Sequence, residues 1–165
     1  MLQSAYSLRN EDFIDTIDVV CPKCHSKAIV RGGKPYQPIR DYELDVQFSC
    51  ANCGFSLKFE KTQTISQLKN SKGQPIKSNV IFLNSSIDPF FGFDVWYQSD
   101  TRFGILWAYN LDHLKVIESY IAEKLRSRNG IPIRNNSMGS RFPQWVKEAK
   151  NRDYLLKNIT KLKLK

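Results

Sequence analysis

Four cysteines form two C-x-x-C pairs, Cys21-Pro22-Lys23-Cys24 and Cys50-Ala51-Asn52-Cys53. Zinc prefers four soft ligands in a tetrahedron with Zn–S bonds of about 2.3 Å, and a C-x-x-C turn folded back on itself presents two thiolates to one ion. Two such turns complete the ligand set. The spacing therefore predicts one structural Zn²⁺, held by Cys21, Cys24, Cys50 and Cys53.

Three other interpretations of these residues remain open. Cys21-Pro22-Lys23-Cys24-His25 also matches the C-x-x-C-H pattern of c-type haem attachment, which would leave the second pair unexplained. A C-x-x-C pair can lower the pKa of one thiol and cycle a disulfide. His25 can replace a cysteine as a ligand, although four cysteines already fill a tetrahedral shell.

Each pair lies between two β-rich segments, so the sequence predicts two hairpins joined by one metal. The expected strands cover residues 13–20, 27–31, 42–49 and 55–59. Apolar and polar residues alternate in the third of these, which places Asp41, Glu43 and Asp45 along one solvated strand face. Gly54 follows the second pair at a tight turn, where a side chain can obstruct the amides that approach the sulfur.

The segment from Asp18 to Glu60 resembles the zinc ribbons of transcription initiation and elongation factors, most clearly at Cys50-Ala51-Asn52-Cys53-Gly54 followed by Lys58-Phe59. The resemblance implies a three-stranded antiparallel sheet, one structural zinc, and contact with polymerase or nucleic acid. Transcript-cleaving members hold catalytic magnesium on an adjacent Asp-Glu pair. The matching positions here are Asp41 and Tyr42, so transcript cleavage is not implied.

The chain is also similar to small bacterial zinc-ribbon-containing proteins of unassigned role. This likeness rests on Gly104-Ile105-Leu106-Trp107-Ala108 ahead of a helix and on Ser140-Arg141-Phe142-Pro143-Gln144-Trp145 near the end. It implies no mechanism, because a fold does not determine a function.

The remaining chain predicts a second unit, with strands first and helices last. The polar stretch 67–78 is expected to be a linker or a long surface loop. Three strands are expected beyond it, the last two joined as a hairpin: residues 79–84, 92–98 and 103–109. The expected domains are a zinc ribbon with its N-terminal strand at 1–66 and a strand-rich unit ending in basic helices at 79–165.

Two to three helices are expected at the C-terminal end. Asn110 is a typical N-cap for a helix over 111–128. Pro143 suits the first turn of a second helical region, which carries Trp145 and extends, with a break, through Leu162. The predicted fold class is therefore α+β.

The positive charge is confined to the last third of the chain. The protein has 165 residues and a formal net charge of +9. Residues 1–113 are neutral overall, whereas residues 114–165 contain 13 basic and 4 acidic side chains and carry the whole excess. Such asymmetry indicates an anionic partner, either nucleic acid or an acidic protein.

Seven cations of this region are candidate contacts to such a partner: Arg126, Arg128, Arg141, Lys147, Lys150, Arg152 and Lys157. Phosphate-binding cations beside aromatic rings are typical of single-strand binding, although Trp145 can equally belong to the core. The leading hypothesis is a non-enzymatic, nucleic-acid-associated protein. The alternative is a protein-interaction module, such as an immunity protein, an antitoxin or an adaptor. A solvated lysine-rich helix face would explain the pattern without a partner.

Composition also bears on location and on catalysis. No apolar run approaches the roughly 20 residues of a membrane helix, and the N-terminal stretch is too polar and acidic for a signal peptide, which predicts a cytoplasmic protein. An enzyme is not expected, because His25 and His113 are the only histidines and no phosphate-cradling glycine loop is present. A metal-dependent enzyme built on Asp41, Glu43 and Asp45 ranks last.

Overall fold

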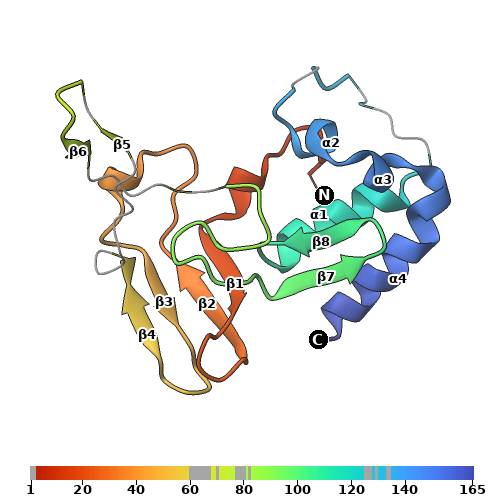
Figure 1. Ribbon diagram of the computed structural model, residues 1–165. Helices are drawn as coiled ribbons and strands as arrows, with labels where there is room; N and C mark the ends of the chain where they lie inside the picture. The colour runs from red at the N-terminus through yellow and green to blue at the C-terminus, as the bar shows by residue number, and fades with distance from the viewer. Residues whose placement is uncertain are drawn as a thin grey trace.

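A computed structural model of the chain shows a mixed α+β protein (Figure 1). The structure describes residues 3–59, 68–69, 71–76, 81, 83–124, 128, 130–132 and 135–165. A four-stranded antiparallel sheet lies on one side, the helices gather on the other, and a two-stranded hairpin lies between them. Among these residues, no helix has both the length and the apolar character needed to cross a membrane.

The larger sheet has the strand order β1-β2-β3-β4, and its strands are β1 (Thr16–Val20), β2 (Lys27–Arg31), β3 (Gln47–Ser49) and β4 (Ser56–Lys58). One row of directly opposed side chains crosses all four strands: Ile17, Val30, Phe48 and Leu57. The first three of these are fully buried. The row sets the register, because a slip of one residue would turn the apolar set toward solvent.

The sheet has four strands rather than the three that the resemblance implied. Strand β1 pairs with β2 over all five of its residues, from Thr16 opposite Arg31 to Val20 opposite Lys27. Its inward residues, Ile17 and Val19, are fully buried. This N-terminal strand therefore belongs to the sheet because it completes the sheet's apolar face.

The strand expected over 42–49 is shorter in the structure. Only Gln47–Ser49 pairs with β2, whereas 42–46 forms turns after a short 3₁₀ helix at Ile39–Asp41. Strand β2 ends at Arg31, and Gly32, with a φ of 96°, turns the chain away, so the residues before Gln47 have no partner on β2. Leu44 is consequently 70% exposed instead of facing the core.

Two neighbouring glycines let the loop after β2 close against the sheet. A Cβ on Gly32 would lie 2.1 Å from the carbonyl oxygen of Asp45, and a Cβ on Gly33 would lie 2.1 Å from that of Ile14. Both distances are far inside van der Waals contact, so only glycine allows these backbone crossings. The return path of the loop is therefore fixed at two points.

Strand β1 is hydrogen-bonded on both of its edges. On the edge opposite β2, the Val20 N–H donates to the Asp94 carbonyl and the Trp96 N–H donates to the Asp18 carbonyl, both at 2.8 Å. On the same strand, the Asp18 N–H donates to the Tyr109 carbonyl at 2.7 Å. Backbone pairing therefore continues from the four-stranded sheet into the second half of the chain.

A hairpin of β7 (Tyr97–Thr101) and β8 (Gly104–Ala108) follows this contact. Strand β8 lies within the expected 103–109. Strand β7 begins later than the expected 92–98, because residues 94–96 pair with β1 instead.

The expected linker at 67–78 is described only in part. Within it, β5 (Leu68–Lys69) pairs with β6 (Pro75–Ile76). Most of the strand expected over 79–84 lies outside the described residues. The domain boundary placed in this region stays a prediction.

Aromatic rings pack the first sheet against the second half of the chain. The rings of Phe91 and Phe93 meet the ring of Phe48 edge-on, at centroid distances of 6.2 and 5.0 Å. Asp88 holds the turn that carries them, since its carboxylate accepts the N–H groups of Phe90, Phe91 and Phe93 at 2.6–3.0 Å. Burial raises the pKa of Asp88 to about 6. The buried side chains of both halves form one continuous cluster.

Helix α1 (Leu111–Ala122) begins where the sequence predicts. The Asn110 Oδ1 accepts the His113 N–H at 2.9 Å, so Asn110 is the N-cap. Its Nδ2 also donates to the carbonyls of Phe13 and Thr16 at 3.2 and 2.8 Å, which ties the helix start to β1. The helix ends at Ala122, before the expected end at 128, and residues 125–127 lie outside the described part.

Three further helices complete the chain: α2 (Met138–Arg141), α3 (Gln144–Lys147) and α4 (Arg152–Lys163). Pro143 is the N-cap of α3, and the expected break occurs at Glu148, where the backbone is extended before a 3₁₀ turn at Ala149–Asn151. With α1 this makes four helices among the described residues, one more than the two to three expected.

Helix α4 is amphipathic and packs on both α1 and β7. Its residues Leu155, Ile159 and Leu162 are buried at helical spacing. At its first residue, the Arg152 guanidinium donates to the carbonyls of Ile121 and Glu123, both at 3.0 Å. Arg152 therefore satisfies carbonyls at the C-terminal end of α1 that have no partner within that helix.

We expect Arg152→Met to lower the free energy of unfolding by about 2 kcal/mol, because two helix-end carbonyls lose a charged donor. Urea denaturation measures this change. Lys157→Met is the matched control on the same helix, since Lys157 is exposed and makes no hydrogen bond or ion pair with the described residues; it should change stability by less than about 0.5 kcal/mol. Equal losses in the two variants would contradict the capping role.

Candidate metal centre

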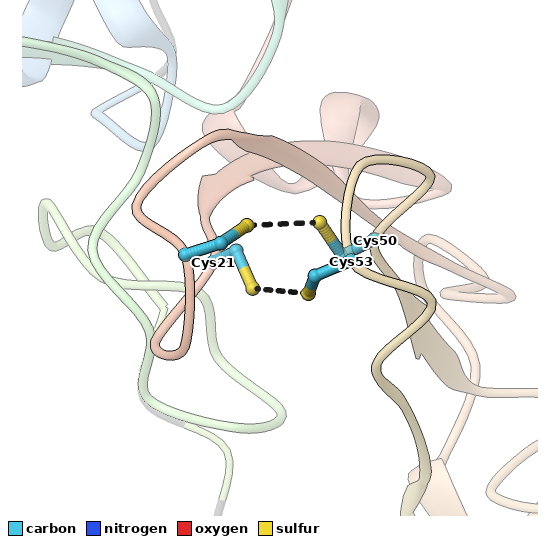
Figure 2. A group of neighbouring side chains, drawn as sticks. Cys21, Cys50 and Cys53 are labelled. Atoms are coloured by element: carbon cyan, nitrogen blue, oxygen red, sulfur yellow. Dashed lines mark hydrogen bonds between the residues drawn. The ribbon is translucent and has the colours of Figure 1, made fainter.

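The structure brings the four predicted ligand residues into one cluster. The sulfur-to-sulfur distance is 3.7 Å between Cys21 and Cys53 and 3.5 Å between Cys24 and Cys50. All four sulfurs lie within 4.8 Å of one another. Figure 2 shows labelled side chains of the cluster pointing toward one another from two separate turns.

These distances fit metal coordination better than disulfide bonding. Four sulfurs placed about 2.3 Å from a central zinc ion are separated by about 3.8 Å along each edge of the tetrahedron. A disulfide needs about 2.05 Å, and all four cysteines are free thiols. The close pairs also join one C-x-x-C motif to the other, as a shared ion requires, rather than closing within one motif.

Two backbone turns of the same design present the sulfurs. We call them the first knuckle (residues 21–26, between β1 and β2) and the second knuckle (residues 50–55, between β3 and β4). In the first, the His25 N–H donates to the Cys21 carbonyl at 2.9 Å. In the second, the Gly54 N–H donates to the Cys50 carbonyl at the same distance. The sheet then holds the knuckles side by side, because β2 pairs with β3.

The residue after each second cysteine adopts a left-handed backbone conformation. Its φ is 59° at His25 and 72° at Gly54. The sequence predicted a steric reason for Gly54, and this reason is wrong, because an added Cβ would meet no atom within 4 Å. The left-handed φ favours glycine at this position, and His25 adopts the same conformation at the conformational cost of a Cβ.

The cluster is open to solvent on one side. Cys21 and Cys50 are buried, Cys24 is half-buried and Cys53 is exposed. Hydrogen bonds from the Asn52 side chain and from Ser26 lower the pKa of Cys24 to about 5. The Phe55 N–H lowers the pKa of Cys53, but desolvation and the neighbouring sulfurs raise it to about 12. Four adjacent sulfurs therefore need a cation before all of them can be thiolates, and Zn²⁺ supplies that charge.

Alternative ligands for the centre have no support in the geometry. His25 is exposed and is not part of the four-sulfur cluster, which is the single group of potential metal ligands among the described residues. Asp41 lies 3.7 Å from Arg40, and Asp45 lies 2.6 Å from Lys34. The acidic residues Asp41, Glu43 and Asp45 were expected on one strand face, and this was wrong, because the segment forms turns instead of a strand.

The seven candidate binding cations are in different environments. Arg126 lies outside the described residues. Arg128 donates to the Ser140 hydroxyl at 3.1 Å, and Lys147 donates to the Ser140 carbonyl at 2.8 Å. Lys150 is exposed and lies 3.3 Å from Glu148. Arg152, as described, caps α1.

The remaining two cations have no such partners. Arg141 and Lys157 are exposed and make no hydrogen bond or ion pair with the described part of the chain. Lys161 lies one helical turn beyond Lys157 and is exposed in the same way. Of the seven predicted cations, Arg141 and Lys157 are therefore available to an external anion, and Lys161 joins them.

Sequence reasoning missed a cleft of about 650 Å³ in the second half of the chain. Its walls come from four separate stretches: residues 9–11, 83–84, 105–107 and 136–146. His113 and Ile117 of α1 also line it. No local pattern indicates such a site, because its residues meet only through the packing of distant segments.

No protein family matches the chain, and neither a curated protein nor a solved structure matches it. The resemblance to transcription-factor ribbons therefore rests on the cysteine spacing and on the four-cysteine cluster alone.

The two knuckles allow a paired test of the left-handed residue. We expect Gly54→Ala to lower the free energy of unfolding of the metal-loaded protein by about 1 kcal/mol. His25→Gly should raise it by up to about 1 kcal/mol, less the chain entropy that glycine adds to the unfolded state. Thermal or urea unfolding at saturating zinc measures both changes. Losses of equal size in the two variants would contradict the conformational explanation.

Proposed function

We propose that this is a non-enzymatic, zinc-ribbon-like protein in which Cys21, Cys24, Cys50 and Cys53 bind one structural Zn²⁺. The observation that carries the proposal is the tetrahedron-like spacing of the four sulfurs. When bound, the metal joins the ends of two hairpins that otherwise share only the short β2–β3 pairing. Structural zinc contributes a folding free energy of about 10–16 kcal/mol in isolated zinc fingers, far more than the three residue pairs between β2 and β3 supply.

Zinc binding has a direct test. Protein purified anaerobically should contain about one zinc per chain by elemental analysis, and Cys50→Ser should abolish that content and lower the unfolding midpoint. His25→Ala is the control, because it changes a residue of the first knuckle, next to Cys24, without removing a thiol; it should keep the full zinc content. Metal-free protein with a Cys–Cys disulfide, or loss of zinc in His25→Ala, would contradict the four-thiolate centre.

We further propose that the protein associates with nucleic acid through its basic C-terminal region. All of the net charge of +9 belongs to residues 114–165. Lys157 and Lys161 are exposed one turn apart on the outer side of α4, where their ammonium groups are available to phosphates. Cations that neutralise phosphates release counterions, so the affinity should fall steeply with salt.

Charge reversal tests this surface. We expect Lys157→Glu/Lys161→Glu to weaken binding of a labelled oligonucleotide by tenfold or more and to reduce the slope of log affinity against log salt by about 2. Arg40→Glu/Lys58→Glu is the matched control, because both side chains are exposed near the four-stranded sheet and the change in net charge is identical. Absence of binding at low salt, or equal weakening by the two double variants, would contradict the proposal.

An acidic protein partner is the second candidate, since the same exposed cations suit it. The two candidates differ in nuclease sensitivity. Recovery of nucleic acid from native lysate with the full-length chain favours the first. Recovery of one protein at equal stoichiometry, unchanged by nuclease and lost in Lys157→Glu/Lys161→Glu, favours the second.

A further inference from the structure

The cleft described above has the volume and the lining of a small-molecule site. Its volume of about 650 Å³ lies within the range of about 300–1,000 Å³ that such sites occupy. Both apolar side chains and polar groups line it. We propose that this cleft binds a nucleotide, that is, a planar base that carries a phosphate.

Two indole rings that line the cleft pack against neighbouring aromatic rings. The Trp145 ring is stacked on Phe103, with centroids 6.0 Å apart and an interplanar angle of 18°. The Trp107 ring contacts Tyr109 and His113 at centroid distances of 5.0 and 5.7 Å. Rings fixed in this way stack on a planar ligand at little entropic cost. Ile105, on the same strand as Trp107, is 45% exposed and also lines the cleft.

His113 supplies a directed donor to the cleft. Its Nδ1 accepts the Tyr109 N–H at 3.1 Å, so the proton of the neutral imidazole is on Nε2. Burial, with only 1% of the residue exposed, lowers the pKa to about 3 and keeps the ring neutral. The Nε2–H donates to no acceptor among the described residues, although His113 lines the cleft. A carbonyl or ring nitrogen of a base satisfies this donor.

The charged side chains that line the cleft favour an anion. The Arg9 guanidinium is held by the Asn136 amide oxygen at 2.5 and 3.3 Å, in the orientation of that amide that suits its neighbours. Arg141 is exposed and unpaired within the described residues. One carboxylate, Glu11, lines the same cleft, and its Oε1 accepts the Tyr36 N–H at 3.1 Å. The lining thus contains two guanidinium groups and one carboxylate, which already accepts a backbone hydrogen bond. This excess of positive charge suits a phosphate, which Arg binds in a bidentate manner.

These features together select the ligand class. The indole rings stack best on a planar ring, and the His113 donor binds an acceptor on that ring. The guanidinium groups bind an anion attached to it. A nucleotide combines all three, either free or as one unit of a single strand. This inference does not depend on the exposed lysines of α4, because none of them lines the cleft.

Titration calorimetry on the full-length chain tests the inference with the four ribonucleoside 5′-monophosphates, their nucleosides, inorganic phosphate and short single-stranded oligonucleotides. We expect saturable one-to-one binding of at least one monophosphate with a Kd below about 1 mM. The matching nucleoside and inorganic phosphate should each bind at least about tenfold more weakly. If the oligonucleotide binds more tightly than the monophosphate, the ligand of the cleft is one unit of a single strand. If the monophosphate binds more tightly, the ligand is a free nucleotide.

Two variants locate the site. Ile105→Glu places a carboxylate in the cleft at an exposed strand position, and Arg141→Met removes the unpaired guanidinium; each should weaken monophosphate binding about tenfold. Lys58→Met has the same charge change as Arg141→Met, lies on β4 outside the cleft and should leave the affinity within about twofold. Circular dichroism and urea unfolding confirm that each variant is folded.

Three results would overturn the inference: no saturable binding of any monophosphate or oligonucleotide at about 10 mM, unchanged affinity in both Ile105→Glu and Arg141→Met, or equal weakening by Lys58→Met. Failure of this inference can be distinguished from failure of the proposed function. If oligonucleotide binding is lost only in Lys157→Glu/Lys161→Glu, the α4 surface is supported and the cleft is excluded as the nucleotide site.

Discussion

Hydrogen bonds along both edges of β1 are the constraint on which the rest of the structure depends. One edge pairs with β2 and so with the sheet that carries both knuckles, while the other pairs with 94–96 and Tyr109 and so with the hairpin and α1. The strand ends at Val20, directly before the first cysteine. A metal bound there would stabilise a strand that both halves of the chain share, which links the cysteine cluster to a helical region whose described residues include no group of potential metal ligands.

The basic character of the C-terminal third serves the fold as well as any partner. Arg152 caps α1, Lys147 and Arg128 bind Ser140, and Lys163 is paired with Glu118. A count of cations along the sequence therefore overstates the surface that is free to meet a phosphate. The exposed cations without a described partner include Arg141 on α2 and Lys157 and Lys161 on α4.

The sequence predicted correctly those features that depend on residues close together in the chain. The C-x-x-C spacing predicted the cysteine cluster, Asn110 predicted the start of α1, and Pro143 predicted the start of α3. The errors arise where a distant backbone segment competes. Residues 42–46 alternate like a strand but have no strand partner on β2 once Gly32 turns the chain away, and 94–96 leave the expected hairpin because they pair with β1. The cleft, assembled from four distant stretches, has no signature in any one of them.

The loop between the two knuckles crosses other backbone at Gly32 and Gly33, where there is no room for a single additional carbon. Every single-base change in a glycine codon that alters the amino acid introduces a Cβ. Neither position therefore tolerates a substitution. The rest of the loop can change in length and composition during evolution far more easily than either glycine can be replaced.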